Sequence, residues 1–211
     1  MDGGRRGGRR GGSVVVRVGD YHDLSAAGVE CASVDGAYTM ETLVHAGEPK
    51  RALAELFRVL RPGGRLALYE YDHDWCGEGK VGEEGESEEE RYFRERMEVI
   101  NRYAAMPGYA MFDRGVLPRL VEEVGFEDVV VRDLSANVEP MLRLFFILAY
   151  VPYLLVRMFG LEKWFVNTVA GVEGYRGRKH WGYIVVTARK PGEDPGTRDQ
   201  SSFILEDKKA R

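Results

Sequence analysis

Residues 35–75 of this 211-residue chain, DGAYTMETLVHAGEPKRALAELFRVLRPGGRLALYEYDHDW, decide its fold. The stretch opens within residues 34–40, VDGAYTM, which predict a strand. Glu48-Pro49 predicts the start of a helix, because proline is favoured in the first helical turn. Apolar residues then recur at helical spacing until Pro62-Gly63-Gly64 predicts a turn, and residues 65–71 predict the next strand. This strand–helix–strand unit is expected to cross over right-handed.

The same alternation of strand and helix patterns continues on both sides of this unit. Short apolar or β-branched runs predict strands, and helical spacing predicts helices, over these segments: strands at residues 14–18, 128–132 and 180–189, and helices at 92–103 and 116–124. Asp113 is expected to cap the second of these helices, and Gly125 is expected to end it. The alternation predicts an α/β sheet with helices covering both faces and a ligand site at the carboxyl ends of the strands.

The composition is that of an ordinary globular protein, with 44% hydrophobic and 30% charged residues. A formal net charge of -4 gives no general attraction to nucleic acid, so no nucleic-acid partner is expected. Cys31 and Cys76 provide neither a disulfide framework nor a metal site, and no metal is predicted. The Gly/Arg-rich start is unlike a secretory signal, which together with the cysteine usage predicts a cytoplasmic protein.

Three segments are too polar or too rich in glycine to form a core. Residues 1–12 (MDGGRRGGRRGG) are expected to be a disordered Gly/Arg leader, and residues 191–211 are expected to be a disordered tail. The acidic, Gly-rich residues 77–90 predict a solvated loop. The folded domain is therefore expected to span residues 13–190.

An apolar segment, residues 140–171, interrupts the pattern before the last strand and is expected to be helical. Within it, residues 144–156 carry no charge, but this run is shorter than a membrane span needs and it contains Pro152. So much apolar surface favours a lipid-like ligand. Four alternatives remain open for residues 141–178: a lid over a hydrophobic pocket, a membrane contact, a contact in a homo-oligomer, or part of the core. The membrane contact would run through residues 141–165 and would make the protein peripheral on an intracellular membrane.

The sequence RVLRPGG at residues 58–64, with the strand before it and the acidic and aromatic strand end after it, resembles a known family. Residues 35–75 are similar to the second half of a class I S-adenosylmethionine-dependent methyltransferase domain. The branch they most resemble contains sterol 24-C-methyltransferases and the ubiquinone and menaquinone C-methyltransferases. The resemblance implies a Rossmann-like class I methyltransferase sheet, with S-adenosylmethionine as cofactor and the family's strand order 3-2-1-4-5-7-6.

The family also has a glycine-rich cofactor loop and an acidic residue for the ribose, both upstream of the position that Asp20 takes here. This chain has only its Gly/Arg leader in that place. The sheet is therefore expected to be N-terminally truncated, and the chain alone is expected to bind S-adenosylmethionine weakly or not at all. The strand over residues 14–18 then either pairs directly with the strand over 34–40 or leaves an exposed sheet edge that is prone to association.

The resemblance assigns the cofactor site to two strand ends. Gly19 and Asp20 correspond to the end of the family's third strand, where the Asp carboxylate accepts a hydrogen bond from the adenine amino group. Met40, Glu41 and Thr42 correspond to the end of the fourth strand, beside the methionine part of the cofactor. The alternative is that Asp20 is a turn residue and that the residues after Met40 cap the next helix.

Residues 70–75, EYDHDW, form the densest set of functional groups in the chain. Methyl transfer is an in-line displacement, for which a protein mainly supplies alignment and a dry pocket. Carboxylates and aromatic rings stabilise positive charge, and a histidine removes a proton from a hydroxyl or an enol. The expected roles are catalysis by Glu70, His73 and His45, and substrate contact by Tyr38, Tyr71, Asp72 and Trp75. The alternative for residues 70–75 is a polar loop anchored by Trp75, and the alternative for His45 is a structural role.

The sequence therefore predicts an S-adenosylmethionine-dependent methyltransferase that acts on a hydrophobic small molecule, sterol-, quinone- or lipid-like. The alternative is a non-catalytic, methyltransferase-like fragment that binds a lipid surface or a protein partner through the apolar segment.

Overall fold

A computed structural model of the chain describes residues 12–74 and 87–192. The Gly/Arg leader up to residue 11, Trp75, Cys76, most of the predicted acidic loop and the tail from residue 193 lie outside the described residues. The elements follow one another in this order: β1 (Val34–Met40), the short 3-10 helix η1 (Leu43–His45), α1 (Pro49–Val59), β2 (Leu60–His73), α2 (Glu88–Tyr103), the short 3-10 helix η2 (Tyr109–Met111), α3 (Val116–Val124), β3 (Glu127–Asp133), α4 (Ser135–Met158), α5 (Val166–Arg176) and β4 (Trp181–Arg189).

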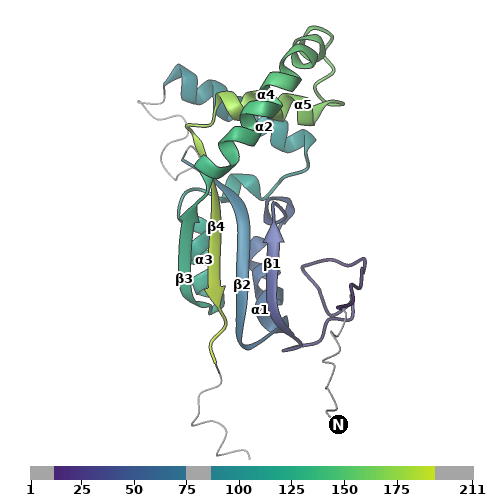
Figure 1. The fold of residues 1–211 in the computed structure, drawn as a ribbon, viewed down its shortest axis with the longest axis vertical. Coiled ribbons are helices and arrows are strands. Elements are labelled where there is room, and N and C mark those ends of the chain that lie inside the picture. The colour runs from purple at the N-terminus through teal and green to yellow at the C-terminus, as the bar shows by residue number, and fades with distance from the viewer. Residues whose placement is uncertain (1–11, 75–86, 193–211) are drawn as a thin grey trace, which may run out of the picture.

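The four described strands form one sheet in the order β1-β2-β4-β3 (Figure 1). The first pair is parallel, with Gly36 opposite Arg65 and Met40 opposite Tyr69. The last strand, β4, runs antiparallel to both β2 and β3. This arrangement equals the 4-5-7-6 part of the strand order implied by the family resemblance. The predicted α/β sheet is confirmed, and so are the predicted strands at 34–40, 128–132 and 180–189.

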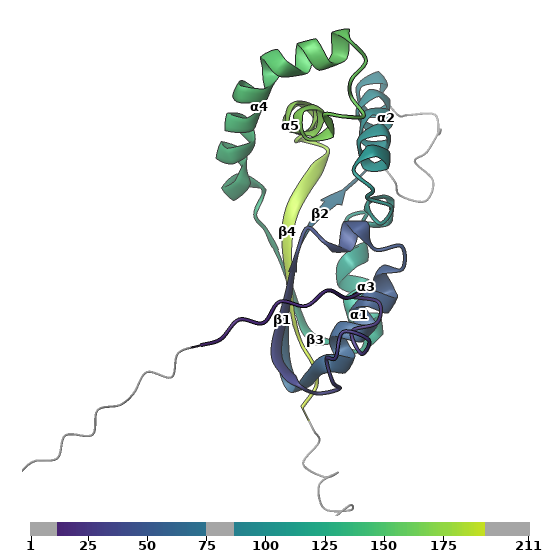
Figure 2. The same cartoon turned by 90° about the vertical axis from the view of Figure 1, so that its right-hand side faces the viewer.

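Helices α1 and α3 lie on the same face of the sheet (Figure 2). Apolar side chains from these helices and from β2 and β4 form the main core, which includes Leu53, Leu56, Leu66, Leu68, Leu117, Val121, Ile184 and Val186. The prediction that helices cover both faces is wrong for the described part of the chain. In that part the remaining long helices, α2, α4 and α5, gather at the end of the sheet instead (Figure 1).

The predicted strand at residues 14–18 is wrong. These residues form no strand, and the exposed fraction of Val14 is 92% and that of Val18 is 100%. Strand formation depends on packing against a neighbouring strand, so β-branched residues alone do not produce one. In the described sheet β1 is an edge strand, and its Tyr38 side chain is 74% exposed.

Several predicted boundaries of helices and strands differ from those observed. The Pro62-Gly63-Gly64 sequence does not separate the helix from the strand, because β2 begins at Leu60 and continues through it, with Gly63 at a φ of 79°. Asp113 does not cap α3; the N-cap is Gly115, with a φ of 83°. Ser87 caps α2 in a capping box with Glu90, so the predicted acidic loop ends before residue 88.

The apolar segment folds as two helices, α4 and α5, which pack against each other, and α5 also packs against α2. Figure 2 shows α4 curving around α5 above the sheet. A second, smaller core holds these helices together and contains Ile100, Tyr153, Val156, Val169 and Val172. The predicted helical insertion is therefore confirmed, and it forms a helical end to the domain.

Candidate functional site

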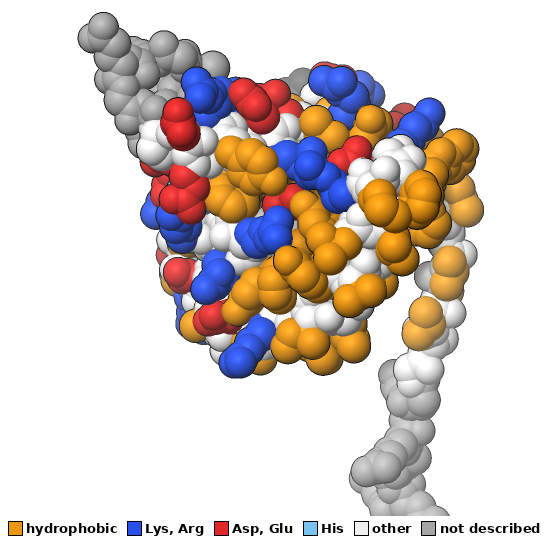
Figure 3. Space-filling model, turned by 90° about the horizontal axis from the view of Figure 1, so that it is seen from above, with side chains coloured by type: hydrophobic (Ala, Val, Ile, Leu, Met, Phe, Trp, Pro, Cys, Tyr) orange, Lys and Arg blue, Asp and Glu red, His pale blue; other side chains and the backbone are white. Residues whose placement is uncertain are grey.

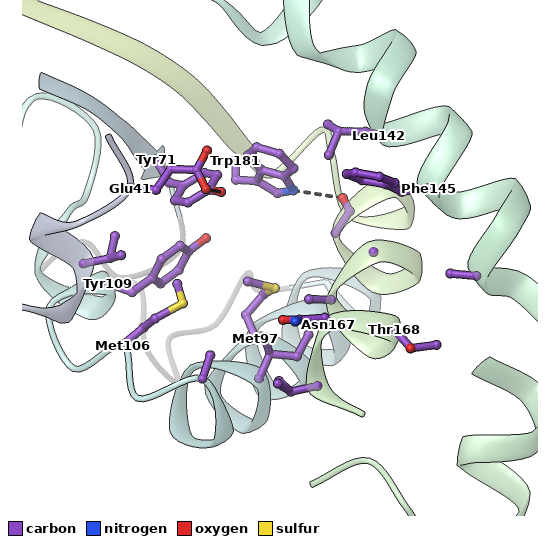
Figure 4. Close-up of a pocket in the computed structure, with 18 of the residues that line it drawn as sticks. Glu41, Tyr71, Met97, Met106, Tyr109, Leu142, Phe145, Asn167, Thr168 and Trp181 are labelled. Carbon is purple, nitrogen blue, oxygen red and sulfur yellow. Dashed lines mark hydrogen bonds between the residues drawn. The ribbon is translucent and has the colours of Figure 1, made fainter. Parts of the chain in front are cut away.

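A pocket of about 770 Å³ lies between the carboxyl ends of β1 and β2 and the helices α2, α4 and α5. Figure 4 shows side chains from all these elements turned toward it. Its lining is mainly apolar and includes Val44, Met97, Ile100, Met106, Leu142, Phe145, Leu148, Pro152 and Val166. The position agrees with the rule that α/β sheets bind ligands at the carboxyl ends of their strands.

Glu41 supplies a carboxylate at the sheet side of this pocket. Its Oε2 accepts a hydrogen bond from the Tyr71 hydroxyl at 2.6 Å, and its Oε1 accepts one from the Tyr183 hydroxyl at 3.0 Å. The Glu41 backbone has a φ of 52°, a left-handed conformation that a non-glycine residue adopts only when its surroundings hold it. Strain of this kind occurs often at ligand sites, and here it lies at the tip of β1.

The two tyrosines that hold Glu41 remain hydrogen-bond donors over the whole physiological pH range. Burial, reinforced by the neighbouring Glu41 carboxylate, raises the pKa of both Tyr71 and Tyr183 well above the usual value for a phenol. Trp181 borders the same pocket, and its ring packs edge-on against Tyr71 with the centroids 5.6 Å apart. The carboxylate therefore sits in a rigid aromatic frame.

Glu70 precedes Tyr71 in β2, and its side chain is fully buried. Its Oε1 accepts hydrogen bonds from the backbone N–H groups of Thr42, at 3.0 Å, and Leu43, at 2.9 Å. Burial raises the pKa of the Glu70 carboxyl to about 7. Glu70 does not line the pocket, so its observed contacts fix the turn between Glu41 and η1.

We expect Glu70 to make stability depend on pH. Because the pKa is raised to about 7 in the folded state, the folded protein binds a proton more tightly than the unfolded chain does. The free energy of unfolding should therefore fall as pH rises from about 4.5 to 7, by up to about 3 kcal/mol more than in Glu70→Gln. Urea unfolding of both proteins across this range measures the difference, and parallel curves would contradict the expectation.

The two candidate catalytic histidines occupy different surroundings. His45 borders the pocket, and its Nδ1 lies 2.9 Å from the backbone oxygen of Ala105. His73 is fully buried away from the pocket lining, with its Nε2 2.7 Å from the Tyr109 oxygen and its Nδ1 3.1 Å from a carboxylate oxygen of Asp113. His45 is therefore placed to meet a ligand in the pocket, whereas the contacts of His73 are structural.

The two groups of candidate cofactor residues are linked at the edge of the sheet through Tyr21. The loop after Gly19 lies beside the end of β1, because the Tyr21 hydroxyl donates a 3.4 Å hydrogen bond to the Thr42 backbone oxygen. The Asp20 carboxylate is exposed and accepts a hydrogen bond from the His22 backbone N–H at 2.8 Å. Met40 is also exposed, next to the strained Glu41. The roles of these residues in cofactor binding stay predictions.

The candidate substrate residues do not share one place. Tyr71 lines the main pocket, whereas Tyr38 lies on the exposed edge of β1 and is not part of the lining. Asp72 borders a second cavity of about 580 Å³, where its carboxylate lies 3.6 Å from Arg114. Trp75 lies outside the described residues. Successive residues of a strand point to opposite faces, which separates Tyr71 from its neighbours in sequence.

Sequence reasoning missed several pocket residues. Trp181 comes from β4, and Tyr109, Met97 and Asn167 come from helical segments. Tyr183, also from β4, is not part of the lining but donates a hydrogen bond to Glu41. Figure 4 shows the Tyr109 hydroxyl directed into the cavity. Trp181 and Tyr183 alternate at the start of β4, which was a usable sign that they share one face of a strand. The local sequence did not show which strand β4 pairs with. In the described residues, no three His, Cys, Asp or Glu side chains lie together as a metal site requires.

The sheet order β1-β2-β4-β3, with its antiparallel last strand, and the ligand pocket at the strand ends are those of a class I methyltransferase fold. Residues 4–68 match the family profile described as a methyltransferase domain. The chain is 41% identical, over 84% of its length, to the S-adenosyl-L-methionine-dependent Diels-Alderase iccD of Talaromyces variabilis, of which it covers 58%. It is 32% identical, over 49% of its length, to 24-methylenesterol C-methyltransferase 2 of Arabidopsis thaliana, of which it covers 26%.

Solved structures agree with this fold. Geranyl diphosphate C-methyltransferase from Streptomyces coelicolor A3(2) superposes with a TM-score of 0.54 at 14% identity, over 82% of this chain and 52% of that one. The chain is thus similar to S-adenosylmethionine-dependent methyltransferases and has the class I fold. The chain spans 58% of the length of the iccD protein, little more than half of that relative.

Proposed function

We propose that this protein binds S-adenosylmethionine beside the carboxyl end of β1, although its sequence predicts weak binding by the chain alone, and transfers its methyl group to a hydrophobic small molecule in the pocket. One observation carries the proposal. Among the described residues that line the pocket, Glu41 supplies the one carboxylate, and it faces an apolar wall built by α2, α4 and α5. Such a site suits a ligand that is apolar along most of its length and reacts at its polar end.

The acceptor groups at the end of β1 fit this cofactor. S-adenosylmethionine supplies an electrophilic methyl group on a positively charged sulfur, and it also carries ammonium and amino groups that donate hydrogen bonds. The carboxylates of Asp20 and Glu41 are acceptors with negative charge. The backbone turn after Met40 is held by Glu70 through Thr42 N–H, which keeps Glu41 in place.

The residues of this chain have three roles in the proposed reaction. The apolar wall excludes water and aligns the acceptor with the methyl group. The Glu41 carboxylate, held by Tyr71 and Tyr183, stabilises positive charge near the reacting atoms. His45, which borders the pocket, accepts a proton where the acceptor is a hydroxyl or an enol.

The relatives with named substrates support a hydrophobic acceptor. One is a methyltransferase of 24-methylenesterol and another methylates geranyl diphosphate. A pocket of about 770 Å³ has room for molecules of this class. We therefore propose an isoprenoid- or sterol-like substrate.

Replacing Glu41 with glutamine should lower kcat/KM by about a hundredfold, because the negative charge is lost while the size is kept. Release of S-adenosylhomocysteine with a panel of isoprenoid and sterol acceptors measures the reaction. Glu48→Gln is the matched control, since Glu48 lies on the surface with its side chain 70% exposed. If the unchanged protein releases no S-adenosylhomocysteine with any acceptor and shows no cofactor binding by calorimetry, the proposal fails.

A second candidate function is an intramolecular cycloaddition with the cofactor bound but not consumed. It is favoured by the 41% identity to a protein named as an S-adenosyl-L-methionine-dependent Diels-Alderase. An apolar pocket that folds a flexible polyene brings its two reacting ends together, which lowers the entropic part of the barrier. Mass spectrometry separates the two functions. Methyl transfer makes the product heavier by one methylene and releases S-adenosylhomocysteine, whereas cyclisation gives an isomer of the substrate and leaves the cofactor unchanged.

A further inference from the structure

Helix α4 presents a large apolar surface that the fold does not cover. Exposed fractions are 60% for Ile147, 66% for Val151 and 66% for Met158. The surface continues around the end of the helix into the connection to α5, where Phe159, Trp164 and Phe165 are also exposed, with Trp164 at 75%. Monomeric soluble proteins rarely expose so many contiguous apolar side chains, and such a surface is typical of an interaction site.

The two sides of α4 have separate tasks. Its inner side lines the pocket with Leu142, Phe145 and Pro152, and it packs Tyr153 into the small core. Its outer side, with Ile147, Val151 and Leu154 among others, touches none of the pocket. The outer surface is therefore not explained by the ligand site.

The segment that carries this surface has an excess of positive charge. Residues 135–180 carry six Lys and Arg residues but three Asp and Glu residues, although the whole chain has a formal net charge of -4. One of the three acidic residues, Glu173, is buried. Figure 3 views this end of the molecule and shows Lys and Arg side chains lying between broad areas of hydrophobic side chains. Arg143 lies directly before residues 144–165, and Arg157 and Lys163 lie within them. Arg157 pairs with Glu162 at 3.3 Å.

We propose that the outer side of α4 and the α4–α5 connection, residues 144–165, bind the surface of an anionic lipid bilayer. The apolar side chains enter the boundary between headgroups and acyl chains, and the basic residues pair with lipid phosphates. Trp164 and Lys163 stand together at the tip, where the ammonium lies 5.6 Å from the indole centroid. Tryptophan and lysine are the side chains that favour the membrane interface.

A second copy of the chain is the competing occupant, and charge disfavours it. In a symmetric dimer the same basic residues would face each other, whereas an anionic bilayer attracts them. A span is disfavoured as well, although in the described part of the chain α4 is long and apolar enough for one. Tyr153 and Val156 are buried against α5, and Pro152 and the pocket lie on the inner side, so crossing a bilayer would require α4 to leave its own domain.

Co-sedimentation of the full chain with vesicles tests the proposal without cofactor or substrate, so its result is independent of the proposed reaction. We expect binding to vesicles of phosphatidylcholine with phosphatidylserine, and weaker binding to phosphatidylcholine alone. The triple variant Ile147→Gln, Val151→Gln, Leu154→Gln should bind at least about tenfold more weakly, because the inserted apolar area is lost. The double variant Arg143→Glu, Lys163→Glu should lose about tenfold on the anionic vesicles only.

Two control variants alter the same residue types at the other end of the domain. Val130→Gln changes an exposed apolar residue of β3, and Arg119→Glu reverses a charge on α3. Both should bind vesicles like the unchanged protein, and circular dichroism checks that every variant is folded. The proposal is overturned if the unchanged protein stays in the supernatant with both vesicles, or if the triple variant binds as tightly as it does. It is also overturned if ultracentrifugation shows a dimer that the triple variant dissociates while no protein binds vesicles.

Discussion

Replacing Glu173 with alanine is expected to lower the free energy of unfolding by about 3–5 kcal/mol, the cost of breaking a buried ion-pair cluster. The Glu173 side chain is fully buried between α2, α4 and α5. It accepts a hydrogen bond from the Tyr153 hydroxyl, and its Oε1 lies 3.8 Å from Arg96 Nε and 3.7 Å from Arg157 Nη1. Without the carboxylate, the positive charges of Arg96 and Arg157 lose the buried negative charge that lies between them.

Urea unfolding measures this loss, and Glu139→Ala provides the matched control. Glu139 also pairs with an arginine, Arg178, at 3.6 Å, but its side chain is 53% exposed. Exposed pairs contribute little, so the control should lose less than about 1 kcal/mol. Glu173→Gln, which keeps the size and one hydrogen-bond acceptor, should fall between the two. Equal losses from the alanine variants of Glu173 and Glu139 would show that the buried cluster does not hold the helices together.

Replacing Asn167 with tryptophan should reduce kcat/KM by about a hundredfold with little change in stability, because a large ring then occupies space needed by the substrate. Asn167 is in the first turn of α5 and points into the pocket (Figure 4). Its exposed side chain gives the ring room to enter without displacing the core. The measurement is turnover of whichever acceptor the product assay identifies, at saturating cofactor.

Asn137→Trp is the control for this prediction. Asn137 is also an exposed asparagine in the first turn of a helix, α4, but it does not line the pocket. Its variant should keep the activity of the unchanged protein. If Asn167→Trp is as active as Asn137→Trp, the substrate does not bind in this pocket, and the proposed function would lose its main support.

Local sequence patterns predicted most of the elements because each pattern reflects one buried face. The apolar residues of α1 recur at helical spacing and do pack on the sheet, as the burial of Ala52, Leu53 and Leu56 shows. Gly125 ends α3 as expected, with a φ of 108° that favours glycine. Residues 14–18 have the composition of a strand but form none, since a strand also needs a partner that local composition does not describe.

The site was predicted less completely than the fold. The sequence identified the strand ends that contribute Glu41 and Tyr71, and both residues line the pocket. It also grouped Glu70, Asp72 and His73 with them, although each of these three side chains is buried elsewhere. A run of polar residues predicts a functional region, but the alternation of a strand decides which of its side chains share a cavity.

The sequence by itself determined the α/β class, the order of the helices and strands, and the resemblance carried by residues 58–64, because these depend on periodicity and on turn residues that act over a few positions. Only the tertiary structure decided that Tyr183 from β4 meets Glu41 from β1, 142 residues apart, and that one side of α4 closes a pocket while the other faces outward. The physical reason is that strand pairing and helix packing join distant segments, and the geometry of those contacts is set by the whole core and not by any one stretch of chain.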